Sequence, residues 1–200
     1  DSFDLQLDKS NFDIRDIITP TVNTFEKRCQ DRGIFLDSVF LTDNTIVYAD
    51  RTKIQQVIYN LVDNAIKFTP EGRQIRVQVT EKDNKIFISV KDEGVGIPKD
   101  AQKKVFERFY KTDPSRGKDK TGTGLGLAIT KEIIKAHGEQ ITLTSEEGKG
   151  SEFIFSLPKE KDMLVPIKPV HIESRNEGYS EADTSSPSIK SNGKFRIKDS

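Results

Sequence analysis

Two glycine clusters in this 200-residue chain have the composition of phosphate-binding backbone. They are Asp92-Glu93-Gly94-Val95-Gly96 and Gly122-Thr123-Gly124-Leu125-Gly126-Leu127. Because glycine has no Cβ and tolerates positive φ, such segments let backbone N–H groups approach phosphate oxygens closely. The second cluster leads directly into residues 127–135, whose apolar spacing predicts a helix. Phosphate would then lie at a helix N-terminus, where unpaired N–H groups and the helix dipole favour negative charge.

A helix predicted for residues 51–68 separates apolar from polar side chains. Its apolar stripe, which we expect to pack on a sheet, is Ile54, Val57, Ile58, Leu61, Val62 and Ala65. Its polar face holds Gln56, Asn60, Asn64 and Lys67. Two amide oxygens one turn apart suit Mg²⁺, a hard cation that keeps several waters and takes few protein ligands. We therefore predict that Asn60 and Asn64 bind magnesium, that Gln56 contributes through water, and that the Lys67 ammonium reaches a phosphate.

The carboxylate of Asp92 ends a predicted strand and opens the first glycine cluster. A carboxylate at this point can accept the exocyclic amine of adenine, which would select adenine over guanine. Asp-x-Gly is also an ordinary turn sequence, so the residue taken alone leaves a purely structural role open. Between the clusters, residues 103–120 hold seven basic and three acidic side chains, a balance that suits an anionic ligand.

The hydrophobic pattern predicts both strands and helices along the chain. We expect a strand at 3–7, then a helix capped by Ser10 or Asn11 that contains Pro20 as a kink or first-turn break. Weak strands follow at 36–41 and 45–49. Alternating residues predict hairpins at 75–79 with 86–90 and at 141–144 with 153–157. From Pro158 the pattern is lost, and 159–200 is expected to be a flexible tail or linker.

Composition limits what can be expected of this chain. Lys plus Arg equals Asp plus Glu, 32 of each, so net charge gives no case for nucleic-acid binding. The single Cys29 excludes an intrachain disulfide and suits a reducing compartment. No apolar run reaches the ~20 residues of a membrane span. Because the chain starts at Asp1 rather than Met, we expect it to be part of a longer protein.

Four segments together resemble the N, G1, F and G2 boxes of bacterial sensor histidine kinases. They are residues 60–65, 92–96, Phe106-Glu107-Arg108-Phe109 and 122–126, in that order and at matching spacing. The resemblance covers about residues 3–158. It implies an α+β Bergerat-type fold, with a mixed, mostly antiparallel sheet and helices on one face. It also implies a catalytic and ATP-binding domain at 1–158, with a mobile lid over about 98–121 that Phe106 and Phe109 pin by packing.

The resemblance also implies a role for each candidate residue. Asn60, Lys67 and Lys111 would be catalytic, Asn60 and Asn64 would handle Mg²⁺, and Asp92 would read adenine. The implied ATP ligands are Asn60, Asn64, Lys67, Asp92, Gly94, Gly96, Ile97, Tyr110, Lys111, Gly122, Thr123, Gly124, Leu125, Gly126 and Leu127. Lys111 stands where many relatives carry Arg, so it lacks the bidentate guanidinium fork.

The histidine that such a kinase phosphorylates is missing from this chain. Only His137 and His171 are present, and His137 follows a predicted helix as a structural residue would. We therefore expect the acceptor on an upstream dimerisation domain of a homodimeric full-length protein, which passes phosphate to a response regulator. The expected location is cytoplasmic, either free or as the cytoplasmic part of a membrane-anchored kinase.

Two other functions share these motifs. Hydrolytic ATPases of the same superfamily place a Glu general base one turn before the magnesium-binding Asn, where this chain has Asn60. An amide cannot take a proton from water at neutral pH, which argues for transfer to histidine and against fast hydrolysis. A non-catalytic nucleotide-binding or anti-sigma-type module remains the other alternative.

Overall fold

The computed structural model describes residues 5–110 and 123–160. The chain divides into two units, Asp1–Met163 and Leu164–Ser200, and the second lies outside the described residues. Lys111 and Gly122, the 111–121 part of the predicted lid, and nearly all of the predicted 159–200 tail lie outside them as well.

Five of the described strands form one sheet. Their spatial order is β2 (Phe35–Phe40), β4 (Gln74–Lys82), β5 (Lys85–Asp92), β7 (Gly150–Pro158) and β6 (Ile141–Glu146). Only the β2–β4 pair is parallel, and the other neighbours pair antiparallel. A separate antiparallel pair joins β1 (Lys9–Asp13) to β3 (Ile46–Asp50).

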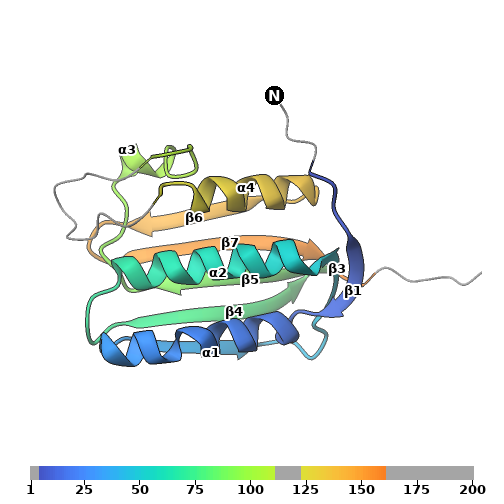
Figure 1. Cartoon of the computed structure of the whole chain (residues 1–200), viewed down its shortest axis with the longest axis horizontal. Coiled ribbons are helices and arrows are strands. Elements are labelled where there is room, and N and C mark those ends of the chain that lie inside the picture. The colour runs from blue at the N-terminus through green and yellow to red at the C-terminus, as the bar shows by residue number, and fades with distance from the viewer. Residues whose placement is uncertain (1–4, 111–122, 161–200) are drawn as a thin grey trace, which may run out of the picture. The chain divides into compact units, whose positions relative to one another are not determined.

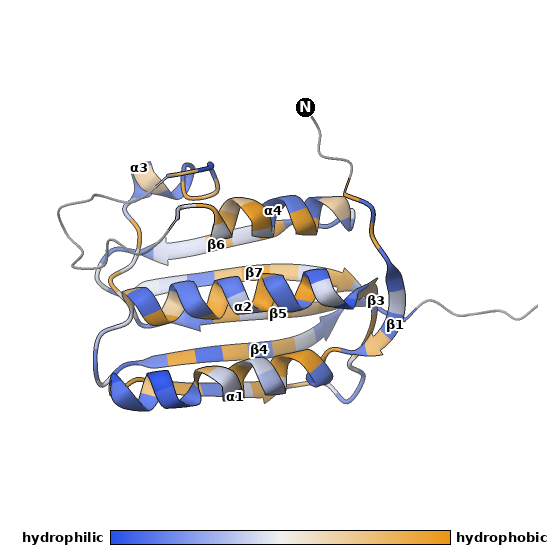
Figure 2. Cartoon of the chain, viewed as in Figure 1, coloured by the Kyte–Doolittle hydropathy of each residue, from blue (hydrophilic) through white to orange (hydrophobic). Residues whose placement is uncertain are grey.

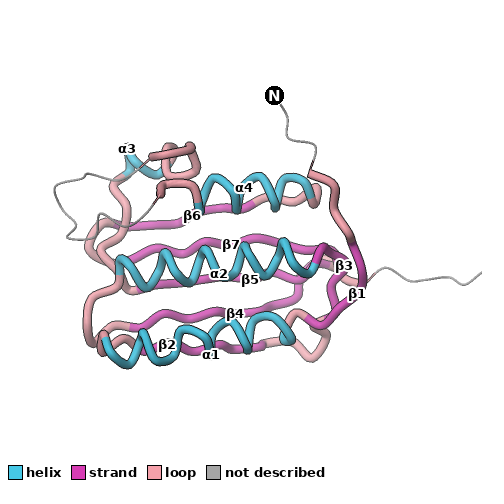
Figure 3. The backbone as a smooth tube through the Cα atoms, viewed as in Figure 1, coloured by secondary structure: helices cyan, strands magenta, loops and turns pink. Residues whose placement is uncertain are grey.

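Three helices cover the same face of this sheet, as Figures 1 and 3 show: α1 (Arg15–Asp31), α2 (Arg51–Phe68) and α4 (Gly126–Ala136). A short helix, α3 (Lys99–Gln102), follows the first glycine cluster. Figure 2 shows hydrophobic and hydrophilic residues alternating along β4 and around α2, so one side of each element faces the core. The predicted α+β class, with a mostly antiparallel sheet and helices on one face, is confirmed.

The β4–β5 hairpin is built as its sequence predicts. Lys82 pairs with Lys85 across the two-residue turn Asp83-Asn84. Both turn residues have positive φ, 50° and 60°, which matches the twist of the flanking strands and which Asp and Asn tolerate. The β6–β7 hairpin is likewise present, with Leu143 opposite Phe153.

The beginning of the domain differs from the prediction. Residues 5–7 of the expected 3–7 strand are not in a strand, and Ser10 and Asn11 lie in β1 rather than capping a helix. Their backbones pair with Ala49 and Tyr48 of β3, so long-range pairing overrides their local capping preference. Helix α1 starts at Arg15 and continues through Pro20, which therefore neither ends the helix nor limits it to a first turn.

The first and last strands of the domain meet at β3. Strand β1 pairs along β3, and Val47 of β3 also forms a bridge with Lys159, just after β7. The Glu160 N–H donates to the Ile46 carbonyl at 3.1 Å. Entry and exit of the domain are thus adjacent, at the end of the sheet that is on the right in Figure 1. Among the described residues, no helix combines the length and apolar character needed to cross a membrane.

Candidate nucleotide-binding site

The polar face of α2 contacts the start of α4. The Asn60 Nδ2 donates to the Gly126 carbonyl at 3.3 Å, which leaves the Asn60 amide oxygen as an acceptor. Asn60, Asn64 and Lys67 are half-buried, whereas Gln56 is exposed. The Asn64 side chain makes no hydrogen bond to another described residue. The predicted polar face is therefore present, and it adjoins the second glycine cluster.

The carboxyl group of Asp92 ends the row of β5 side chains that faces the helices. The alternation that buries Ile86, Ile88 and Val90 continues to Asp92, which is only 5 % exposed. The Gly94 N–H donates to the Asp92 Oδ1 at 2.8 Å. Burial raises the pKa of this carboxyl from its ordinary 3.8 to about 6, and backbone hydrogen bonds from Gly94 and Ser151 oppose that rise only in part.

The glycines of the first cluster are required by close backbone packing. A Cβ at Gly94 would lie 2.5 Å from the Asp92 Oδ1 and 2.6 Å from the Phe68 carbonyl oxygen, at the end of α2. Gly96 has φ +69°, and a Cβ there would lie 2.0 Å from the Glu146 carbonyl oxygen. The chain thus packs between α2 and the β6–β7 turn, in addition to any approach to phosphate.

The described part of the second cluster packs on the end of the 106–109 segment. The Phe109 N–H donates to the Gly124 carbonyl at 2.9 Å, and both residues have positive φ, 64° and 70°. A Cβ at Gly124 would come within 2.9 Å of the Phe109 backbone. Gly126 differs, because a Cβ there would meet only Asn60 at an ordinary 3.8 Å.

Two phenylalanines expected to pin the lid behave differently. Phe106 packs edge-on against Phe153, with ring centroids 6.0 Å apart, and the Lys131 ammonium lies 5.7 Å from its ring centroid. Phe109 is 72 % exposed, so the prediction that it is a buried anchor is wrong. With its positive φ and its hydrogen bond to Gly124, Phe109 packs against the second cluster through its backbone and not through its ring.

The other predicted ligands differ in their exposure and in the hydrogen bonds they make. The Ile97 N–H donates to the Ser145 Oγ at 2.8 Å, and the Tyr110 N–H donates to the Glu107 carbonyl at 3.3 Å. Thr123 is exposed, while Leu125 and Leu127 are half-buried. Lys111 and Gly122 lie outside the described residues, so their predicted roles stay predictions.

An ion cluster on α2 was missed by the sequence interpretation. The Lys67 Nζ lies 2.5 Å from the Asp63 Oδ2, and the Arg28 Nη1 lies 2.6 Å from the Asp63 Oδ1. The spacing of Asp63 and Lys67, four residues apart on a helix, is a sequence signal for the first pair. Arg28 has no such signal, because its contact depends on how α1 packs on α2.

His137 has a structural place at the end of α4. Its Nε2 accepts the Asp50 N–H at 3.0 Å, which identifies Nδ1 as the protonated nitrogen that donates to the Ile133 carbonyl at 2.8 Å. The Asp50 side chain in turn caps α2 by accepting the Lys53 N–H. Burial lowers the pKa of His137 and so favours the neutral ring that these bonds require.

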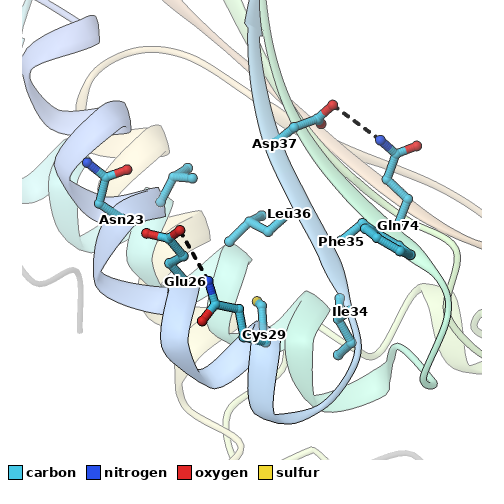
Figure 4. A pocket seen from close by; sticks show the side chains of 10 residues that line it. Asn23, Glu26, Cys29, Ile34, Phe35, Leu36, Asp37 and Gln74 are labelled. Carbon is cyan, nitrogen blue, oxygen red and sulfur yellow. Dashed lines mark hydrogen bonds between the residues drawn. The ribbon is translucent and has the colours of Figure 1, made fainter.

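A groove of about 680 Å³ lies away from these residues, between α1 and β2 (Figure 4). Its walls carry Glu26 on α1 and Asp37 on β2, and Phe35 and Gln74 lie near its end. None of its lining residues is basic or belongs to the predicted nucleotide ligands. An acidic groove does not suit phosphate, and we assign it no part in nucleotide binding.

The described residues fit magnesium and an adenine nucleotide. A buried carboxylate at the end of β5 suits an exocyclic amine, and the two half-buried amides of Asn60 and Asn64, one turn apart, have oxygens of the kind that suits magnesium. No group of three or more His, Cys, Asp or Glu side chains in the described ranges is arranged to hold a metal by itself.

Comparisons with known proteins place the chain in a family. Residues 49–161, more than half of the chain, match the family described as histidine kinase-, DNA gyrase B- and HSP90-like ATPases. Over 165 residues the chain is 40 % identical to sensor histidine kinase WalK of Bacillus subtilis (strain 168), covering 81 % of this chain and 27 % of WalK. It is 38 % identical to sensor protein SrrB of Staphylococcus aureus (strain MRSA252), covering 68 % and 23 %. The chain thus spans about a quarter of these relatives.

Solved structures extend the likeness to the fold. The nucleotide-free catalytic domain of histidine kinase ThkA matches with a TM-score of 0.67 and 33 % identity, over 76 % of this chain and 99 % of that one. Full-length ShkA in complex with AMPPNP matches with a TM-score of 0.69 and 29 % identity, over 77 % and 32 %. The predicted resemblance and fold are confirmed. The chain belongs to the histidine kinase-, DNA gyrase B- and HSP90-like ATPase family, and its relatives there are sensor histidine kinases.

Proposed function

We propose that this chain binds Mg-ATP and transfers the γ-phosphoryl group to a histidine on a dimerisation domain that the chain does not contain. The observation that carries this proposal is the contact between Asn60 and Gly126. It sets the amides of α2 beside the N-terminus of α4, so oxygen ligands for a cation adjoin a place that favours phosphate. The buried Asp92 lies at the end of the neighbouring strand and supports adenine as the base.

Each group then has a separate task. Asp92 accepts the exocyclic amine of adenine, and its burial strengthens that bond by excluding water. Asn60 and Asn64 hold Mg²⁺, which neutralises phosphate charge when bound. Lys67 and Lys111 address phosphate oxygens, and the backbone from Gly122 to Leu127 covers them. Phosphoryl transfer consists mainly of such positioning and charge stabilisation.

Asn60 favours transfer over hydrolysis. An ATPase of this family needs a general base for water at this position, and an amide cannot act as one. A histidine imidazole is a nucleophile that needs no such base. ATPase activity and non-catalytic nucleotide binding are therefore the alternatives that an assay must separate from kinase activity.

Partners follow from the same proposal. A response regulator would receive the phosphate, and one solved neighbour, ThkA, is in complex with the response regulator TrrA. The acceptor domain would belong to the same full-length protein, as a homodimer located in the cytoplasm or on the cytoplasmic side of a membrane. These statements concern more protein than the chain itself.

The test combines this chain with a separate domain bearing a phosphoacceptor histidine. With radiolabelled Mg-ATP, the chain alone should label itself negligibly and hydrolyse ATP slowly, whereas the added domain should gain acid-labile phosphate. The variant Asn64→Ala, whose packing neighbours Leu61 and Ala65 are retained, should fold and lose magnesium-dependent affinity. Rapid hydrolysis by the chain alone, enhanced no further in Asn60→Glu, would instead identify an ATPase. Phosphate on His137 would identify a self-contained kinase.

A further inference from the structure

The carboxylate of Asp63 lies between two cations at the contact of α1 and α2. Its two oxygens take different partners, the Arg28 guanidinium at 2.6 Å and the Lys67 ammonium at 2.5 Å. Only 21 % of the Asp63 side chain is exposed, so these pairs are shielded from water more than ordinary surface pairs. Burial alone would raise the pKa of Asp63, but hydrogen bonds from Lys67 and Arg28 outweigh it, and the pKa lies below its ordinary value.

This arrangement determines how strongly the Lys67 ammonium can attract a phosphate. The ammonium gives one of its three donors to Asp63, so a phosphate oxygen must share the cation with a carboxylate. Arg28 weakens the attraction between Asp63 and Lys67, because it offsets the charge of Asp63. The three groups together have a net charge of about +1. Without Arg28, the pair of Asp63 and Lys67 would be neutral toward an anion.

Helix α1 fixes the position of Arg28. One turn further along the chain, Arg32 donates to the carbonyls of Ile66 and Thr69, the latter at 3.3 Å, where α2 ends. Phe25, one turn before Arg28, packs on Tyr59 of α2 with ring centroids 4.8 Å apart. Contacts on both sides of Arg28 therefore hold α1 against α2 and keep the Arg28 backbone within reach of Asp63.

We propose that Asp63 is a positioning residue that competes with phosphate for Lys67, and that Arg28 sets the strength of this competition. The inference rests on the proposed function, in which Lys67 binds a phosphate. It gives α1, which contributes no predicted ligand, a direct influence on nucleotide affinity. A shift of α1 that withdraws Arg28 would lower that affinity, and a shift that tightens the Arg28 contact would raise it.

Calorimetric titration of the chain with Mg-ATP, Mg-ADP and adenosine tests the competition. Asp63→Asn should tighten Mg-ATP binding about three- to tenfold, because Lys67 loses its competing anion. Arg28→Met should weaken it by a similar factor, and both effects should disappear with adenosine, which has no phosphate. The matched control is Asp37→Asn, which removes the same charge from another Arg-bound carboxylate, because Asp37 on β2 pairs with Arg76 on β4.

Lys67→Met distinguishes a failure of the proposed role of Lys67 from a failure of the competition by Asp63. It should weaken Mg-ATP but not adenosine, and in its background Asp63→Asn should change affinity twofold or less. If Lys67→Met leaves the preference for ATP over adenosine intact, the assignment of Lys67 in the proposed function fails. If that variant behaves as expected but Asp63→Asn leaves Mg-ATP affinity unchanged or weakens it, the competition fails alone. Should Asp63→Asn not fold, an unchanged affinity in Arg28→Met overturns the inference equally.

Discussion

Replacing Asp92 with Asn should stabilise the nucleotide-free chain at neutral pH while it removes the preference for adenine. The side chains are nearly isosteric, and the amide oxygen of Asn can still accept the Gly94 N–H that now reaches the carboxylate at 2.8 Å. What changes is the buried charge, together with one acceptor oxygen that becomes an amide NH₂. The variant therefore separates the cost of burying a carboxylate from the shape of the site.

The magnitude follows from the pKa of Asp92. Burial raises it from 3.8 to about 6, and at 1.36 kcal/mol per pH unit this difference corresponds to about 3 kcal/mol. Asn is uncharged and does not have this desolvation cost. It accepts a weaker hydrogen bond than a carboxylate does, which lowers the stability by about 1 kcal/mol. A net gain of about 1–3 kcal/mol in the free energy of unfolding is expected near pH 7.5.

The sign of the pH dependence is fixed by the same shift. Because the folded state holds the Asp92 proton more tightly than the unfolded state, the wild-type chain loses stability as pH rises from about 4 to about 6. Asn does not titrate, so the advantage of the variant should be small near pH 4 and reach its full value above pH 7. Every other titrating group is common to both proteins and cancels in the difference.

Urea unfolding followed by circular dichroism at a series of pH values measures this difference. Asp63→Asn is the matched control, since the pKa of Asp63 is lowered in the folded chain and its neutralisation should destabilise at pH 7.5. In parallel, Asp92→Asn should lose about tenfold or more in ATP affinity and should no longer discriminate against GTP. A variant that is less stable than wild type at pH 7.5, or a gain that does not vary with pH, would refute the reasoning.

Three further variants, with Gly126→Ala as a control for the first, test the packing of the domain, each by the midpoint of urea unfolding. Gly96→Ala should cost at least about 2–4 kcal/mol, because its φ is +69° and its Cβ would collide with the Glu146 carbonyl. Gly126→Ala, whose Cβ would make only an ordinary contact with Asn60, should fold normally. Thr130→Val should add about 1 kcal/mol, since the buried Thr130 hydroxyl has no hydrogen-bond partner among the described residues. A loss of stability would show that the hydroxyl has a partner. His137→Gln should destabilise at pH 7.5 and flatten the loss of stability that wild type shows as pH falls below 6.5, where the unfolded histidine takes up a proton.

The local periodicity of the sequence was sufficient to predict the elements that position the candidate site. Helix α2 begins and ends where the 51–68 pattern does, and Asp83-Asn84 forms the predicted hairpin turn. In both cases nearby residues supply the whole signal: the spacing of apolar side chains for the helix, and tolerance of positive φ for the turn. The shared polar face of Asn60, Asn64 and Lys67 followed from that helix.

Features that depend on long-range packing could not be predicted in this way. Ser10 and Asn11 have the local chemistry of helix caps, but pairing with β3 places them in a strand. The parallel pairing of β2 with β4, and the contact of Arg28 with Asp63, each join segments that no local pattern connects. The burial of Asp92 is an intermediate case, because alternation along β5 predicts its direction but the helices above the sheet supply the desolvation.

The first and last strands of the domain meet at β3, so the order of the elements along the chain can be changed while their arrangement in space is kept. Because β1 and Lys159 both pair with β3, a peptide linker that passes over β3 would connect residue 160 to residue 8. New termini opened at the Asp83-Asn84 turn would then give a circular permutant with every strand pair retained. In such a protein the glycine clusters stay at the far end of the sheet from the linker (Figure 1), and nucleotide binding should survive the rearrangement.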